Sequence, residues 1–376
     1  MFEPTDDVPG APGTNGALSA DDRRRTLRSP LATRTCPSAR SRSAQGLHEP
    51  ATRLRFLLAL LFTLLLGMVV ALPAAAETPS SWGQAGFFHQ FSTDVDDDGD
   101  FDLWTGYAKG QFVARLDDRV HVRMLGSYYG SSYEWDDPPA IIGSATDFKP
   151  WNTIHVARVN PLFGFELDDR INLFAGPLLE ASLENGADLS NSLKPGGLLG
   201  AEMQVNESLK VGLGVLGVKE IEDDFYIQPL LILDWQTPIE NLSVHASSWT
   251  TRGGRFEIIY GLLDGQLEIA PSVTYRRERF RLKEQDLSIA PPPPVPVPRI
   301  GSKGVGEDRA VLPALRISWL PDHAFVRDTV GALRIDLEAG VALAGDLIFE
   351  TDTGSKIQTT SYDPAPTLGF SVSIPL

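Results

Sequence analysis

Residues 332–350 read ALRIDLEAGVALAGDLIFE, and nearly every second position in this stretch is apolar. A helix would scatter these apolar residues around its axis, whereas a β-strand puts them on one face, because strand side chains alternate between two faces. The stretch therefore predicts one long strand. Its apolar face is expected to carry Leu333, Ile335, Leu337, Ala339, Val341, Leu343, Leu347 and Phe349, and its polar face Arg334, Asp336, Glu338, Gly340 and Asp346.

The same alternation recurs through residues 77–376, and no long helical pattern interrupts it. Six tight connections are expected at residues 116–119, 167–170, 205–209, 238–241, 263–266 and 320–328. Between them lie seven longer and more polar connections, at residues 93–102, 135–150, 185–195, 220–225, 250–254, 284–304 and 351–362. Short turns at one end and long loops at the other are typical of a transmembrane β-barrel, and these 13 connections predict 14 antiparallel strands.

Strand length separates a membrane barrel from a soluble β-sandwich. Strands of soluble proteins run to about 5–6 residues, but several strands here are expected to be longer than about 10, as membrane-spanning strands are. No helix is predicted to cover their apolar faces, so we expect lipid to do so. In a bilayer the sheet must close to satisfy its backbone, so the last strand, LGFSVSIPL (368–376), should pair with the first, near residues 83–92. A soluble secreted β-sandwich or barrel remains the alternative.

The first 76 residues differ from the rest. Residues 1–52 are read as a disordered extension, because they are rich in Pro, Gly, Ser and Arg without apolar periodicity. Residues 53–76 read as a signal peptide, with arginines, an apolar run and an A-x-A site ending at Ala76. A retained anchor is the alternative, and residues 1 to 46 could be an error in the gene's assigned start. The mature barrel would then be residues 77–376.

Charge and cysteine content exclude several classes of protein. The formal net charge is −16, which argues against nucleic acid as a partner, because phosphate binding needs a basic surface. Cys36 is the only cysteine, so neither an internal disulfide nor a cysteine-based metal site can form.

The alternation of the last strand resembles the assembly signal of bacterial outer-membrane barrel proteins. Residues 211–244, 275–282 and 361–374 are also similar to an uncharacterised family of predicted outer-membrane barrels, sharing a strand with Pro before a D/W pair and an Arg-rich strand end. The resemblance implies the outer membrane of a Gram-negative-type bacterium. It also implies lipid and lipopolysaccharide as surroundings, and the barrel-assembly machinery as a partner through the C-terminal strand.

An acidic loop is a candidate metal site. The sequence DVDDDGDFD (94–102) places carboxylates at alternate positions before Gly99, as calcium loops do. We therefore predict Ca²⁺ as a possible cofactor, with the ligands Asp94, Asp96, Asp98, Asp100 and Asp102. A solvated acidic hairpin without metal explains the same residues, and no other cofactor is expected.

Two further segments could carry chemistry. YRRERFRLK (275–283) crowds five cations at a strand end, where the apolar phase moves from odd to even positions and suggests a bulge. These cations are expected to pair with acidic residues across the lumen, with lipid phosphates as the alternative partner. His245-Ala246-Ser247 with Glu257 resembles the H-x-S and acid of barrel lipid-A deacylases.

The sequence thus predicts an all-β outer-membrane barrel with a polar lumen, serving as a passive pore or transport barrel for small solutes. A structural or adhesive surface barrel and a lipid-modifying hydrolase are the alternatives, although no catalytic residue is assigned. The oligomeric state stays open. The predicted lumen-lining residues are Arg115, Arg123, Arg158, Glu166, Glu180, Glu257, Glu268, Arg316, Arg334, Asp336, Glu338 and Asp346.

Overall fold

The computed structural model describes residues 81–96, 99–136, 149–223, 225–250, 253–283, 304–321 and 332–375. All of them belong to one compact unit, residues 57–376. The predicted extension (1–52) and signal peptide (53–76) lie outside the described residues. Among the described residues, no helix is long and apolar enough to cross a lipid bilayer.

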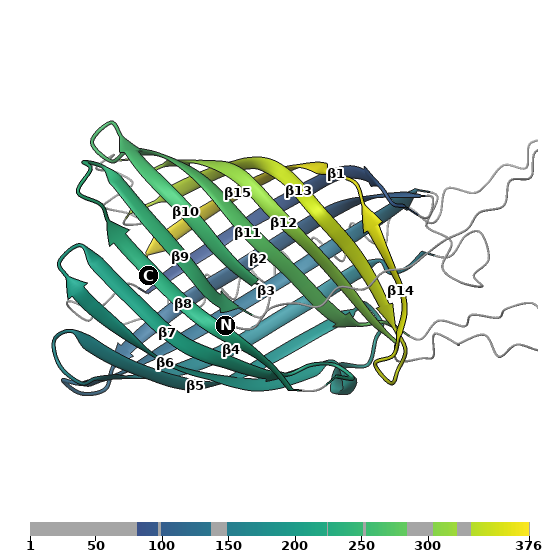
Figure 1. Cartoon of the computed structure of the whole chain (residues 1–376), viewed down its shortest axis with the longest axis horizontal. Helices are drawn as coiled ribbons and strands as arrows, with labels where there is room; N and C mark the ends of the chain where they lie inside the picture. The colour runs from purple at the N-terminus through teal and green to yellow at the C-terminus, as the bar shows by residue number, and fades with distance from the viewer. Residues whose placement is uncertain are drawn as a thin grey trace, which may run out of the picture. The chain divides into compact units, whose positions relative to one another are not determined.

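The described residues form a single antiparallel sheet of long strands (Figure 1). One short 3₁₀ turn, η1 (Leu189–Asn191), lies between β5 and β6. The strands are β1 (Trp82–Asp94), β2 (Asp100–Arg115), β3 (Val120–Asp136), β4 (Thr153–Glu166), β5 (Ile171–Glu184), β6 (Leu193–Asn206), β7 (Leu209–Lys219), β8 (Phe225–Gln236), β9 (Leu242–Thr250), β10 (Gly253–Leu262), β11 (Leu267–Arg281), β12 (Val305–Trp319), β13 (Arg334–Glu350), β14 (Lys356–Tyr362) and β15 (Ala365–Pro375).

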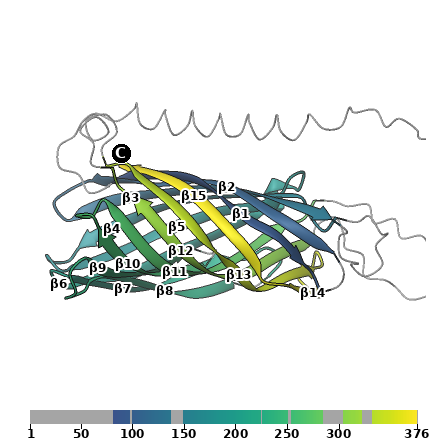
Figure 2. The ribbon, with the colours of Figure 1, turned by 90° about the horizontal axis from the view of Figure 1, so that it is seen from above.

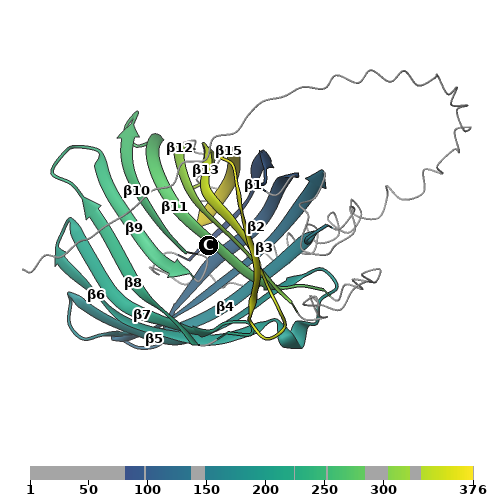
Figure 3. The same cartoon turned by 45° about the vertical axis from the view of Figure 1, so that its right-hand side comes forward.

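The sheet closes on itself into a barrel. Neighbours in sequence pair from β1 to β13, and β15 pairs with both β13 and β1, with Phe87 opposite Phe370. Figure 2 shows β15 lying beside β1, and Figure 3 shows the wall curving round from β6 to β3. The prediction that the last strand pairs with the first is confirmed. Closure leaves the wall without a free edge, as a bilayer requires.

The wall has 14 strands, because β14 and β15 together occupy one position. Both pair with the same side of β13: Tyr362 lies opposite Gly345, and Ala365 lies opposite Ala342. The two segments are therefore one strand interrupted at residues 363–364. The predicted strand number is confirmed, but the predicted loop 351–362 is wrong in extent, because only residues 351–355 form a turn before β14 begins.

The two ends of the barrel differ. We call the end with the connections 116–119, 167–170, 207–208, 237–241 and 263–266 the turn end, and the opposite end the loop end. Asp117 and Asp168 shape two of these turns, because each carboxylate accepts a backbone N–H two residues further on, from Arg119 and Arg170. The first residue of β1, Trp82, and the last residue of β15, Pro375, both lie at the turn end.

The outer face of the barrel is apolar. Phe163, toward the turn end of β4, is 53% exposed, and Leu213, in the middle of β7, is 68% exposed. Trp235 and Trp319 are exposed near the turn end, and Trp104 is exposed toward the loop end. Aromatic residues on both sides of an apolar band are typical of barrels in a bilayer. This surface is far more continuous than the apolar patches of soluble monomers.

The strand phase of β13 differs from the prediction. Ala344 has a positive φ of 48°, and the pairing with β12 shifts between Arg309 and Val311. This bulge turns Leu347 and Phe349 into the interior, where both are fully buried, although Leu337 on the same strand is exposed outside. Asp346 consequently lies on the face opposite Asp336 and bonds to Ser361, so its predicted lumenal position is wrong.

The prediction of a bulge in residues 275–283 is also wrong. Pairing between β11 and β12 runs without a shift from Leu267 to Arg281. Phe280 and Leu282 lie on the interior face, the same face as Glu268, and are buried there. The change of apolar phase arises because the interior becomes apolar at the loop end, not because the backbone slips.

The loop end is narrower than the turn end. Pairing between β10 and β11 ends at Thr274, but β11 continues to Arg281. Arg281 there forms a parallel bridge with Leu183 of β5, on the far side of β6–β10. The end of β11 therefore crosses toward β5 and reduces the opening.

Candidate functional site

The predicted lumen-lining residues other than Asp346 form ion pairs with described residues. Toward the turn end, Arg115 lies 3.2 Å from Glu166. Further around the wall, Arg123 lies 3.4 Å from Glu202. Arg158 pairs with Glu180 between β4 and β5. Each pair joins different strands, so the interior charges also hold the wall together.

Six predicted residues form one network on the opposite side of the interior. Arg316 on β12 contacts Glu257 at 3.0 Å, Asp336 at 3.3 Å and Glu268 at 3.9 Å. Arg334 contacts Glu268 and Asp336, each at 2.8 Å. Arg255, which the sequence analysis missed, joins Glu257 to Glu338. The network spans β10 to β13.

A cavity of about 600 Å³ occupies the turn-end part of the interior. We call it the turn-end cavity. Its volume is within the range of small-molecule sites. The lining combines charged and apolar side chains from most of the wall: Trp82, Lys109, Gly110, Gln111, Val113, Arg115, His121, Arg123, Leu125, Gly126, Ser127, Tyr129, Arg158, Asn160, Leu162, Glu166, Leu178, Glu202, Lys210, Ile232 and Ser247.

The interior face of β4–β8 is apolar above the turn-end charges. This apolar layer comprises Leu162, Phe174, Leu178, Leu198, Leu216, Val218, Leu230 and Ile232, with Leu125 packed against it. The prediction of a polar lumen is therefore incomplete. Alternation cannot reveal this layer, because strands such as β7, LKVGLGVLGVK, are apolar or glycine on both faces.

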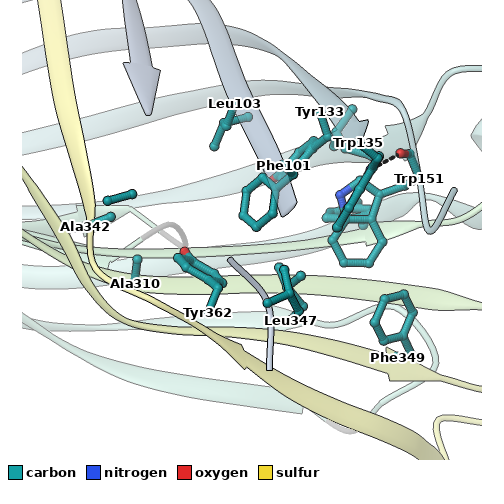
Figure 4. Packing of buried hydrophobic residues seen from close by; sticks show 14 of the residues in the cluster. Phe101, Leu103, Tyr133, Trp135, Trp151, Ala310, Ala342, Leu347, Phe349 and Tyr362 are labelled. Carbon is teal, nitrogen blue, oxygen red and sulfur yellow. Dashed lines mark hydrogen bonds between the residues drawn. The ribbon is translucent and has the colours of Figure 1, made fainter. Parts of the chain in front are cut away.

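An aromatic cluster fills the interior near the loop end (Figure 4). Trp151 is fully buried, with its ring 5.0 Å from Phe280 and 4.9 Å from Phe349 between centroids. Trp135 donates from Nε1 to the Trp151 carbonyl at 2.7 Å. The cluster lies on the same strand faces as Arg123 on β3 and Arg316 on β12, so it occupies the interior near the loop end.

An ionic cluster adjoins the aromatic cluster, and the sequence analysis missed its acidic members. Arg277 binds Glu220 at 2.8 Å and Glu307 at 3.1 Å. Arg279, whose side chain is 3% exposed, binds Glu307 at 3.3 Å and Glu350 at 2.5 Å. Arg277 and Arg279 thus pair with acidic residues as expected, but they lie on the face of β11 opposite Phe280 and Leu282, so the predicted pairing across the lumen is wrong for these two residues. Nothing periodic marks Glu220 or Glu350, because both lie at strand ends.

The Asp-rich segment shows separated carboxylates. Asp100 accepts a hydrogen bond from Ser92 at 3.0 Å, and Asp102 lies 3.4 Å from His89. No group of three or more His, Cys, Asp or Glu within the described ranges could hold a metal ion, and Asp98 lies outside those ranges. Calcium binding by Asp94, Asp96, Asp98, Asp100 and Asp102 stays a prediction.

The H-x-S segment lies on β9. Nε2 of His245 is 3.2 Å from Oγ of Ser243, and Nδ1 is 3.5 Å from Asp234. Ser247 lines the turn-end cavity. Among the described residues His245 thus has Ser243, not Ser247, as its hydroxyl contact, and the arrangement does not prepare Ser247 as a nucleophile.

No protein-family model and no curated protein sequence matches the chain. Solved structures of weak similarity include a FadL homologue of Pseudomonas aeruginosa, with a TM-score of 0.45 and 11% identity over 79% of this chain and 90% of that one. An outer-membrane channel of Pseudomonas putida F1 has a TM-score of 0.38 and 11% identity, over 81% and 100%. The P. putida toluene transporter TodX has a TM-score of 0.35 and 10% identity, over 80% and 91%. The fold assignment rests on this chain's own strand pairing.

Proposed function

We propose that the chain is an outer-membrane transport barrel for small solutes. The observation that supports this best is the combination of a closed wall with an apolar outer face and an interior cavity of about 600 Å³. In this proposal lipid and lipopolysaccharide surround the wall, and the barrel-assembly machinery recognises the last strand. Transport is favoured over hydrolysis because His245 is turned toward Ser243 and Asp234.

The aromatic cluster gives the transport proposal a closed resting state. Trp151, Phe280 and Phe349 fill the interior above the apolar layer. A solute could therefore pass only when these side chains or the end of β11 move. We expect the wild-type barrel to conduct ions rarely and in brief events.

Planar-bilayer recording tests the transport proposal. Trp151→Ala combined with Phe280→Ala should raise the open probability or conductance, since it removes two rings from the blocked section. Each substitution should also lower the free energy of unfolding by about 3–5 kcal/mol, so folding must be verified by heat-modifiable gel mobility. The control is Phe163→Ala, which removes a phenyl ring from the outer face instead of the interior and should leave the recordings unchanged. If neither the folded wild type nor the folded double variant conducts ions, the result would favour a structural or adhesive barrel.

A further inference from the structure

The turn-end cavity has a local excess of positive charge. Its lining includes five basic side chains, Lys109, Arg115, Arg123, Arg158 and Lys210, but only two carboxylates. The whole chain has the opposite balance, with a formal net charge of −16. Because basic side chains gather in this cavity although the chain as a whole is acidic, the electrostatic potential is positive where a solute would bind.

The two lining carboxylates do not neutralise all five cations. Glu166 lies 3.2 Å from Arg115. Glu202 is shared between Arg123 at 3.4 Å and Lys210 at 4.0 Å. Arg158 pairs with Glu180, which also binds Lys194.

Lys109 is the cation best placed to meet an anion. Its Nζ lies over the Tyr107 ring, 5.8 Å from the centroid. No carboxylate of a described residue lies within ion-pair distance of this ammonium group. In the sheet, Lys109 is opposite Gln84 on one side and Ser127 on the other, both neutral.

The other side of the same cavity is apolar. Leu125, Leu162, Leu178 and Ile232 contribute to the lining and also belong to or pack against the apolar layer. Leu125 is half-buried, whereas Leu162, Leu178 and Ile232 are only 1%, 5% and 7% exposed, so these three border the cavity with little open surface. An apolar group placed there would be removed from water at a gain of roughly 25 cal/mol for each Å².

We propose that the turn-end cavity binds amphipathic monoanions, molecules with an apolar body and one carboxylate or similar anionic group. This inference rests on the proposed function, since the ligand would be the transported solute. The apolar body packs on Leu125 and on the edges of Leu178 and Ile232, and Lys109 pairs with the anionic group. A neutral analogue loses the ionic contact, a cationic analogue meets repulsion, and a small anion has nothing to place on the apolar layer.

Calorimetry on the full chain in lipid nanodiscs tests the inference, with empty nanodiscs to subtract partitioning. The probes are phenylbutyrate, phenylbutanol, phenylbutylamine and acetate. Phenylbutyrate should bind at least about tenfold more tightly than the alcohol, and the amine and acetate should give no saturable heat. Equal or tighter binding of the alcohol or amine would overturn the inference.

Variants locate the binding. Lys109→Gln should weaken phenylbutyrate binding about tenfold, whereas Lys109→Arg should retain it because the charge is kept. Lys356→Gln, at an exposed position on β14, is the matched control and should change nothing. Leu178→Asn should weaken phenylbutyrate by disrupting the apolar layer. Phenylbutyrate binding that is equal in Lys109→Gln and wild type would contradict the assignment of the anionic contact.

The binding and conductance results separate the two proposals. A folded barrel that conducts ions but binds no probe would overturn the amphipathic-anion inference and leave transport intact. A folded barrel that binds phenylbutyrate but stays silent in both wild type and the Trp151/Phe280 variant would support the ligand site and contradict transport. A folded barrel that does neither would contradict both.

Discussion

Single hydrogen bonds matter in this wall because lipid cannot replace them. Between β8 and β9 the backbone pairing runs only from Ile232 opposite Ser247 to Gln236 opposite Ser243. Just beyond it, the Leu231 N–H donates to Oγ of Ser248 at 2.8 Å, and Ser248 donates to the Pro229 carbonyl at 3.2 Å. One hydroxyl thus takes the place of a missing backbone partner at this point.

We expect Ser248→Ala to lower the free energy of unfolding by about 1–3 kcal/mol, because it leaves the Leu231 N–H unsatisfied. Urea titration in lipid vesicles, followed by tryptophan fluorescence, would measure the change. Ser132→Ala is a suitable control, because its hydroxyl makes no hydrogen bond to a described residue. If both variants unfold at the wild-type urea concentration, the hydroxyl does not have this role.

Ala344 is the residue that turns the end of β13. A positive φ is unfavourable for any residue with a Cβ and worse for a β-branched one. Ala344→Gly should therefore raise the free energy of unfolding by up to about 1 kcal/mol, and Ala344→Val should lower it by about 1–2 kcal/mol. Equilibrium unfolding of the three proteins would show the order, and a valine variant as stable as wild type would mean that the bulge is absent.

At the scale of elements, the end of β11 is held by charges. Arg279 lies between Glu307 and Glu350 and also donates to the Ile221 carbonyl at 2.9 Å. Removing one member of a buried group of charges leaves the others uncompensated. The stability of the loop end should therefore depend on the balance within the cluster more than on any single pair.

Arg279→Met should lower the free energy of unfolding by about 3–5 kcal/mol. Adding Glu307→Gln to it should restore part of the loss, because one uncompensated carboxylate disappears. Arg170→Met, at an exposed position in a tight turn, serves as the control. The outcome that contradicts a balanced cluster is a double variant less stable than either single variant.

The strands themselves could be predicted from sequence because the outer face obeys one rule. Lipid favours apolar residues where a strand crosses the bilayer, so residues such as Phe163, Leu337 and Trp319 mark the phase of most strands. Tight turns are also local, and Asp117 and Asp168 act through their own neighbouring backbone. Strand number and closure follow from these two signals.

The interior could be predicted only where it is charged. Arg316 and Asp336 interrupt apolar runs and were assigned to the lumen, but Leu162 and Phe280 look like any other core residue in sequence. The phase change at Ala344 depends on a single backbone conformation that no residue type in the stretch requires. Contacts between β5 and β11 join positions far apart in the chain, and no local pattern encodes them.

At the scale of the whole molecule, the chain places its apolar residues in two different environments. Those on the outer face, such as Leu213 and Phe163, remain exposed after folding. Those in the loop-end interior, such as Trp151 and Phe349, are fully buried. A bilayer would shelter the first group in a single barrel, and this is the reason for proposing a membrane location.

Quenching by lipids with brominated acyl chains tests that claim most directly. A variant retaining only Trp319, which is 50% exposed on the outer face, is compared with one retaining only Trp151, which is fully buried. The account predicts that brominated chains quench Trp319 strongly in vesicles and leave Trp151 bright. Equal fluorescence of Trp319 in brominated and ordinary lipid, from a correctly folded protein, would contradict it.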